Sequence, residues 1–189
     1  AQEVASMATL VGQEMEGGAL GLSTGLEYDP GIYSTTEEVV ELARSAASYG
    51  GRYTSHMRSE DRNFWQAIDE ILVIGREAGI PVQISHIKLA MRSLHGQADE
   101  LLRILDGARE EGIDVTADIY PYTYWQSTLT VMFPERDFED RGAATFAGTP
   151  QTGMDAPNVT KPKRSGVRTI IFATKLMTVT TAILRTARA

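Results

Sequence analysis

The sequence contains no cysteine, and this absence excludes several kinds of chemistry. Disulfide bonds, a thiolate nucleophile and a sulfur-bound zinc site are all ruled out. The chain also does not start with a basic stretch followed by an apolar core, so we expect no signal peptide and a cytoplasmic location. Its apolar segment from Thr169 to Ala187 is broken by Lys175 and Arg185, which leaves no run long enough to span a bilayer. We therefore expect no membrane partner.

Acidic residues are almost missing from the last part of the chain. Residues 141–189 contain 8 Lys or Arg residues and one acid, Asp155, whereas residues 1–140 contain the other 10 basic residues and 24 acidic ones. One fold rarely changes composition so abruptly. We therefore divide the chain into an acidic, enzyme-like segment, residues 1–140, and an unrelated, irregular basic C-terminal tail, residues 141–189. We expect this tail to be disordered or translated from a shifted reading frame.

The acidic segment repeats a pattern of a strand followed by a helix. Predicted strands end near Thr24, His56, His86 and Asp118, at spacings of 32, 30 and 32 residues. Such regular spacing predicts about four consecutive β/α units with a parallel sheet, which is half of a (β/α)8 TIM-type barrel. A doubly wound open sheet is the alternative, although no glycine-rich phosphate-binding motif follows any of the strands.

The segments between these strands have helical periodicity. Ser34 to Glu37 has capping-box spacing and predicts the start of the first helix, which Gly50-Gly51 would end. The second helix is predicted from about Asn63 to Ala78, and a third carries Leu101, Leu105 and Ala108. The apolar face of the second helix is predicted to consist of Phe64, Ile68, Ile71 and Leu72.

Two of the three histidines occupy equivalent places in consecutive units. The segments Thr54-Ser55-His56-Met57-Arg58 and Ile84-Ser85-His86-Ile87-Lys88 each end a predicted strand with a histidine. In a parallel sheet both imidazoles would lie side by side at one edge, where they could bind a divalent metal. We predict that His56 and His86 are metal ligands. A single strand histidine is more often structural, and we interpret His95, before Gly96, as a loop histidine near a helix start.

Three further polar residues follow the same strands. If side chains alternate and the strands are in matching register, Lys88, Asp118 and Tyr120 converge with the two histidines at one rim. The same alternation places His86 on the face of Ile84. A lysine and a tyrosine suit an anionic substrate group, by charge and by hydrogen bonding. The alternatives are that Lys88 and Arg58 are solvated strand ends, and that Asp118 caps the following turn.

Four segments of the chain together resemble the N-acyl-D-amino-acid deacylases, or D-aminoacylases, of the amidohydrolase superfamily. They lie within residues 17–134, roughly 60% of the chain, and are Gly18 to Tyr28 with Pro30-Gly31, Gly51 to Glu60, Gln83 to Lys88, and Asp118 to Tyr122. The resemblance implies a zinc-dependent (β/α)8 hydrolase that cleaves the acyl amide of small N-acyl-D-amino acids. It places His56 and His86 at two zinc ligands of the family, and Lys88 and Tyr120 where the family binds the substrate carboxylate.

The chain departs from this family in ways that limit what it can do. The His-x-His pair and the cysteine ligand of the family are absent, and no general-base aspartate is identified, since Asp155 lies in another context. We therefore interpret residues 1–140 as a partial amidohydrolase barrel that is inactive alone, and expect it to self-associate through exposed sheet edges. One alternative is a dihydroorotase-like cyclic amidohydrolase. Another is a non-catalytic β/α scaffold whose basic tail binds an acidic partner, but the tail lacks an aromatic platform and we expect no nucleic-acid partner.

Overall fold

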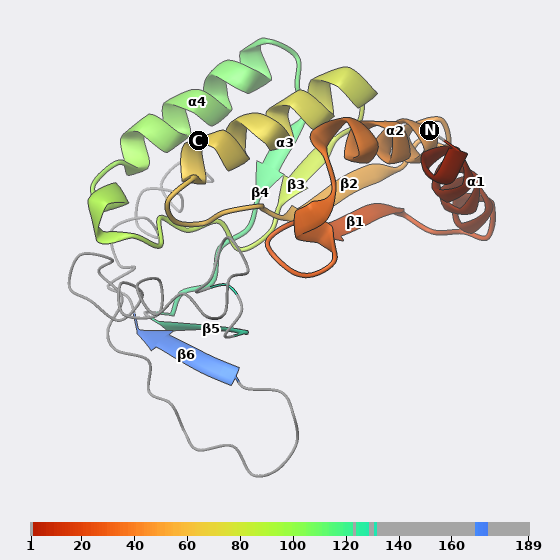
Figure 1. Cartoon of the computed structure of the whole chain (residues 1–189). Helices are drawn as coiled ribbons and strands as arrows, with labels where there is room; N and C mark the ends of the chain where they lie inside the picture. The colour runs from red at the N-terminus through yellow and green to blue at the C-terminus, as the bar shows by residue number, and fades with distance from the viewer. Residues whose placement is uncertain (1, 123, 129–130, 132–168, 174–189) are drawn as a thin grey trace. The chain divides into compact units, whose positions relative to one another are not determined.

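Four strands form a parallel sheet in the order in which they occur along the chain (Figure 1). The computed structural model describes residues 2–122, 124–128, 131 and 169–173. A sequential strand order is that of a barrel, whereas a doubly wound sheet reverses its order at a switch point. The described strands of this sheet therefore favour the barrel and not the doubly wound alternative. They are β1 (Gly21–Gly25), β2 (Arg52–His56), β3 (Val82–Ile84) and β4 (Val115–Ala117).

Three helices connect these strands and lie on one face of the sheet, as Figure 1 shows. They are α2 (Thr36–Ala47), α3 (Phe64–Ala78) and α4 (Ala98–Glu110). The predicted capping box exists one residue later than expected: the Thr35 hydroxyl accepts from the Glu38 N–H, and the Glu38 carboxylate accepts from the Thr35 N–H. A further helix, α1 (Gln2–Glu16), packs against α2, and two 3-10 helices, η1 (Gly31–Tyr33) and η2 (Arg92–Leu94), lie in loops.

The two faces of the sheet differ in polarity. In β2, Tyr53 and Ser55 are buried while Thr54 and His56 remain partly accessible, and in β3 Gln83 is the accessible residue. Since the helices cover one face, the buried side chains point toward them and the polar ones toward the other face, which is the interior of a barrel. The helix faces complete this core with the buried residues Val39, Ala43, Ala46, Phe64, Ile68, Ile71, Leu72, Leu101, Leu105 and Ala108.

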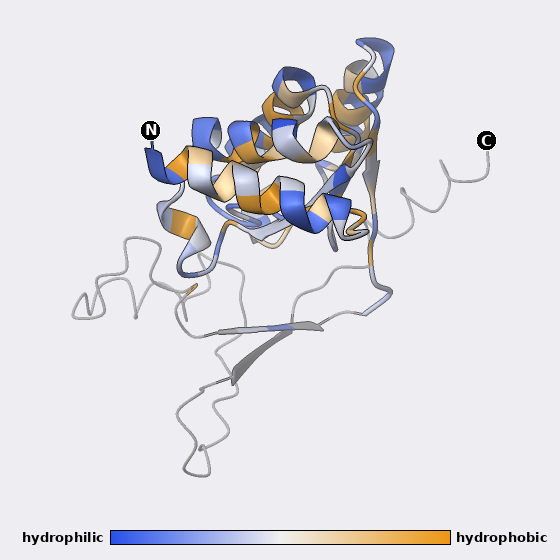
Figure 2. Cartoon of the chain, turned by 90° about the vertical axis from the view of Figure 1, so that its right-hand side faces the viewer, coloured by the Kyte–Doolittle hydropathy of each residue, from blue (hydrophilic) through white to orange (hydrophobic). Residues whose placement is uncertain are grey.

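The helices are amphipathic. Figure 2 shows hydrophilic and hydrophobic residues interleaved along them. Among the described residues, no helix is long and apolar enough to cross a membrane. At the sheet margins, β1 pairs only with β2 and β4 only with β3 in the described part of the chain. Self-association through these edges stays a prediction.

Residues 88–99 and 120–189 form a second compact unit, distinct from the unit formed by residues 1–87 and 100–119. In this second unit, β5 (Tyr124–Thr128) and β6 (Thr169–Ala173) pair as antiparallel strands. Five residues of the predicted irregular tail therefore form a strand. The rest of the tail, including Asp155, lies outside the described residues. The predicted boundary at residue 140 and the predicted disorder beyond it stay predictions.

Candidate metal centre

His56 is the last residue of β2, and the segment that follows β1 holds its ring. Its Nε2 lies 2.7 Å from the Oε2 of Glu27, and the ring of Tyr28 lies 4.5 Å from it between centroids. The Leu26 N–H donates to the His56 carbonyl, which continues the strand pairing past Gly25 and keeps this segment beside the end of β2. Burial raises the pKa of the Glu27 carboxyl, while its hydrogen bond with His56 acts in the opposite direction.

His86 lies two residues beyond β3, at a sharp change of chain direction. Its φ of 41° is left-handed, and within the described ranges it is the one non-glycine residue with a positive φ. Such a conformation costs about 1 kcal/mol or more for an L-residue. The Asp118 carboxylate supports it, because Oδ1 accepts from the His86 N–H at 2.7 Å. Backbone hydrogen bonds from Asp118 to Ile84 and from Ile87 to Asp118 join the ends of β3 and β4 around this point.

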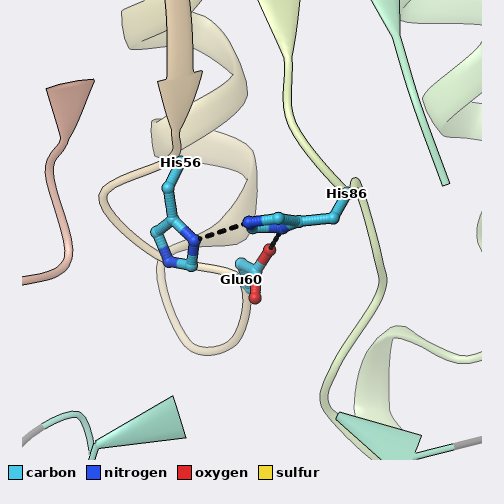
Figure 3. Close-up of side chains that lie close together, drawn as sticks. All are labelled: His56, Glu60 and His86. Carbon is cyan, nitrogen blue, oxygen red and sulfur yellow. Dashed lines mark hydrogen bonds and ion pairs between the residues drawn. The ribbon is translucent and has the colours of Figure 1, made fainter. Parts of the chain in front are cut away.

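The two rings meet, as predicted from the equivalent places of the two histidines. His56 Nδ1 lies 2.9 Å from His86 Nε2, with the ring centroids 4.6 Å apart and the ring planes at 62° (Figure 3). A third residue, Glu60, joins them from the loop after β2, and its Oε1 lies 2.9 Å from His86 Nδ1. One possible ligand atom from each of these three residues lies within 4.8 Å of the other two. Glu60 is only 3% exposed, so a carboxylate is held inside the protein next to the imidazole pair.

This arrangement fits a zinc ion. Zinc takes imidazole nitrogens at about 2.0–2.1 Å, so two nitrogens on one tetrahedral ion stand about 3.3 Å apart. The facing nitrogens of His56 and His86 are 2.9 Å apart, and a movement of a few tenths of an ångström would admit the ion. Nitrogen and carboxylate oxygen donors are also the ligands that remain for zinc in a chain without cysteine.

The predicted substrate-binding residues lie together in the second unit. Lys88 is 2% exposed, and its Nζ lies 5.5 Å from the centroid of the Tyr120 ring, which stacks on Tyr122. The interpretation of Lys88 as a solvated strand end is therefore wrong. Convergence of Lys88 and Tyr120 with the histidines at one rim stays a prediction.

The structure also tests the interpretations of three other residues. Arg58 is not a free solvated strand end but a half-buried, paired residue, because its Nε and Nη2 donate to the Glu70 carboxylate at 2.9 and 2.8 Å. Asp118 binds the His86 backbone and, through Oδ2, the Gln83 amide. His95 follows η2 and precedes α4, which confirms it as a loop histidine, and burial and the nearby Arg92 lower its pKa.

The structure adds two carboxylates, Glu27 and Glu60, that the sequence reading missed. Both lie inside segments that carry the family resemblance, just after β1 and β2. Their position two to four residues past the end of a strand, at the edge where chemistry occurs in barrels, is the signal that could have found them.

Comparisons with known proteins agree with the geometry. The chain is 40% identical over 136 residues to an N-acyl-D-glutamate deacylase and 40% identical over 128 residues to a D-aminoacylase, both from Alcaligenes xylosoxydans xylosoxydans. These alignments cover 72% and 68% of this chain but 27% and 26% of the relatives, so the chain spans about a quarter of their length. No protein-family model matches the chain.

A solved structure extends the agreement to the fold. The crystal structure of N-acyl-D-glutamate deacylase from Bordetella bronchiseptica, complexed with zinc and a phosphonate inhibitor, aligns with a TM-score of 0.74 and 28% identity. The alignment covers 97% of this chain and 41% of that one. The fold and site therefore define a partial (β/α)8 barrel of the amidohydrolase superfamily, as predicted. Within that superfamily the chain belongs to the N-acyl-D-amino-acid deacylase, or D-aminoacylase, family, and it spans part of such a protein.

Proposed function

We propose that this chain forms part of the active site of a zinc-dependent amide hydrolase that removes the acyl group from N-acyl-D-amino acids. The facing imidazoles of His56 and His86 carry the proposal, because they lie at the carboxyl ends of parallel strands, where barrel enzymes place their chemistry. The similar proteins support the substrate class, since they are named as deacylases of N-acyl-D-glutamate and related compounds. A cytoplasmic location stays a prediction.

In this proposal His56 and His86 bind zinc, and Lys88 and Tyr120 bind the substrate carboxylate. A zinc ion bound there would act as a Lewis acid on the acyl carbonyl. The Lys88 ammonium, buried beside the Tyr120 ring, supplies positive charge for a carboxylate, and the tyrosine hydroxyl can donate a hydrogen bond. The His-x-His pair and an identified general base are missing from the sequence. We therefore expect this chain alone to bind zinc and substrate without turnover.

The metal site is tested by titrating the full chain with zinc in an isothermal calorimeter. We expect one zinc-binding event in the unchanged chain and in His95→Ala, which removes the third histidine as a matched control. The double variant His56→Ala/His86→Ala should lose that event, because both nitrogen donors are gone. Equal zinc uptake by the double variant and the control would contradict the proposed site.

The substrate class is tested with the zinc-loaded chain and three ligands: an N-acetyl-D-amino acid, its L-enantiomer and dihydroorotate. We expect the D-compound to bind most tightly, and Lys88→Met to weaken it by removing the positive charge. Preferential binding of dihydroorotate would favour a cyclic amidohydrolase instead.

A further inference from the structure

The outer edge of β1 directs backbone groups away from the sheet. β1 forms one margin of the parallel sheet, and in the described part of the chain β2 is the one strand that pairs with it (Figure 1). The Leu20 carbonyl accepts from the N–H at the start of β2, and the Leu26 N–H donates to the carbonyl at its end. The even-numbered residues of β1 therefore direct their peptide groups toward β2, and Gly21, Ser23 and Gly25 direct theirs outward.

Most of these outward groups have no backbone partner. The Gly25 carbonyl accepts from the Tyr28 N–H, and among the described residues no backbone hydrogen bond reaches the other outward groups of β1. A row of unpaired N–H and C=O groups is a template on which another strand can pair. This edge is therefore a surface that can accept a strand.

The sequence of this edge lacks two common protections against strand pairing. Natural edge strands often carry charged side chains or proline, and β1, Gly-Leu-Ser-Thr-Gly, has neither. Gly21 and Gly25 also have no side chain that could obstruct an opposing strand. Leu20, directly before β1, is 85% exposed. An uncharged edge next to an exposed leucine therefore lies within an acidic segment, residues 1–140, which has 24 acidic and 10 basic residues.

We propose that a second copy of this chain covers the edge, with its β1 antiparallel to the first and the pairing centred on Ser23. Two identical surfaces related by a two-fold axis contact each other reciprocally, and identical strands then run antiparallel. Ser23 lies opposite Ser23 of the second copy, and Gly21 lies opposite its Gly25. These are the residues with outward peptide groups, so the opposed residues exchange N–H···O bonds and join the two four-stranded sheets into one. This inference does not depend on the metal site.

The other margin of the described sheet, at β4, does not allow the same pairing. An antiparallel arrangement centred on Thr116 would place Asp114 of one copy opposite Asp118 of the other. Like charges directly opposite each other destabilise a strand pair. The Asp118 carboxylate also accepts from the His86 N–H and the Gln83 amide, which keeps it at this margin. Of the two margins, β1 is therefore the one that a second copy can cover.

The charge of the chain predicts how salt acts on this dimer. Both copies carry an excess of acidic residues in residues 1–140, so their repulsion weakens as salt screens it, and the dimer should be at least as stable at high salt. Residues 141–189, with 8 basic residues and one acid, could instead bind the acidic segment of another copy. Salt would weaken that contact, so salt dependence distinguishes the two modes of association.

Sedimentation velocity of the full chain, over a concentration series and with a chelator so that no metal links two copies, measures the self-association. We expect a monomer–dimer equilibrium that persists from about 0.05 to 0.5 M sodium chloride. Ser23→Lys places like charges opposite each other at the two-fold axis and should weaken the dimer at least about tenfold. Thr54→Lys is the matched control, because Thr54 is the register neighbour of Ser23 on β2, whose backbone pairs on both sides.

Circular dichroism checks that both variants keep the fold of the unchanged chain. A monomer at every concentration would overturn the proposal. So would a dimer that salt dissociates, or one that Ser23→Lys and Thr54→Lys weaken equally.

The absence of cysteine allows a direct test of the pairing geometry in the full chain. Opposed residues that exchange hydrogen bonds in an antiparallel pair have Cα atoms about 5.5 Å apart, within the range of a disulfide bond. Ser23→Cys should therefore form a disulfide-linked dimer when oxidised glutathione is added. Position 54 lies one strand further from the axis in each copy, about 15 Å from its counterpart, so Thr54→Cys should not form this dimer. No linkage at position 23, or equal linkage at both positions, would overturn the proposed pairing.

Discussion

Replacing Glu70 by alanine is expected to destabilise the first unit by about 2–3 kcal/mol. Glu70 lies on α3 with its side chain 9% exposed, and it accepts hydrogen bonds from Arg58 Nε, Arg58 Nη2 and the Thr36 hydroxyl. Arg58 in turn donates from Nη1 to the Ile32 carbonyl, so one ion pair joins the segment after β2 and helix α3 to the loop before α2. Breaking a fully buried pair costs about 3–5 kcal/mol. We expect a smaller loss of unfolding free energy here, because the Arg58 side chain is 27% exposed and solvent can partly replace its partner.

Urea unfolding followed by circular dichroism measures this loss. The matched control is Glu77→Ala, since Glu77 pairs with Arg44 at 3.5 Å and both side chains are about half exposed. Such exposed pairs contribute about 0–1 kcal/mol, so the control should change the free energy of unfolding little. Replacing Arg58 and Glu70 together by methionine should recover part of the stability lost in Glu70→Ala, because no charge is left without its partner. A loss in Glu70→Ala no larger than in the control would refute the reasoning.

Two further predictions follow from backbone geometry. A Cβ added at Gly31 would lie 2.5 Å from the Gly25 carbonyl oxygen, so Gly31→Ala should lower the unfolding free energy by about 1–3 kcal/mol. A Cβ at Gly107 in α4 meets nothing within 4 Å, so Gly107→Ala should raise the unfolding free energy by up to about 1 kcal/mol. Thermal or urea unfolding checks both variants, and a gain in Gly31→Ala or a loss in Gly107→Ala would contradict the expectation for that variant. Asp118→Ala removes the acceptor of the His86 N–H and should weaken zinc binding about tenfold, which corresponds to about 1.4 kcal/mol of binding free energy. Asp118→Asn keeps an oxygen acceptor and should bind zinc nearly normally. Identical zinc affinity in both Asp118 variants would argue against this support.

The repeat of strand and helix could be predicted from the sequence because each unit contains its own boundary signals. The predicted second helix, Asn63 to Ala78, differs by one residue from α3, and all four residues of its predicted apolar face are buried. The first capping box was displaced by one residue, because Ser34, Thr35 and Thr36 can all cap a helix and the sequence alone does not choose among them. Helix α1 was not predicted. Only Gly12 and Met15 are buried in it, so its apolar pattern is weak.

The site could be predicted only in part. The proximity of His56 and His86 could be predicted because histidine is rare in this chain and both end similar segments, and their role as metal ligands stays a prediction. Glu27 and Glu60 were missed because the chain has many acidic residues, and their contacts with the histidines depend on how two loops fold back over strand ends. Local spacing predicts which strands are neighbours, but it does not predict the path of the loops between them.

The register of β2 and β3 alone would not bring the rings of His56 and His86 together. Tyr53 pairs with Val82, an offset of 29 residues, so the position beside His56 in strict register belongs to Ser85. Continued alternation would place His86 on the face of Ile84, which is buried under the helices, and the two imidazoles would then point to opposite sides of the sheet. The left-handed backbone of His86, held by Asp118, ends the alternation and turns the ring toward His56. We interpret this strained residue, which persists because its surroundings hold it, as a sign that the strand end has a functional role and not only a structural one.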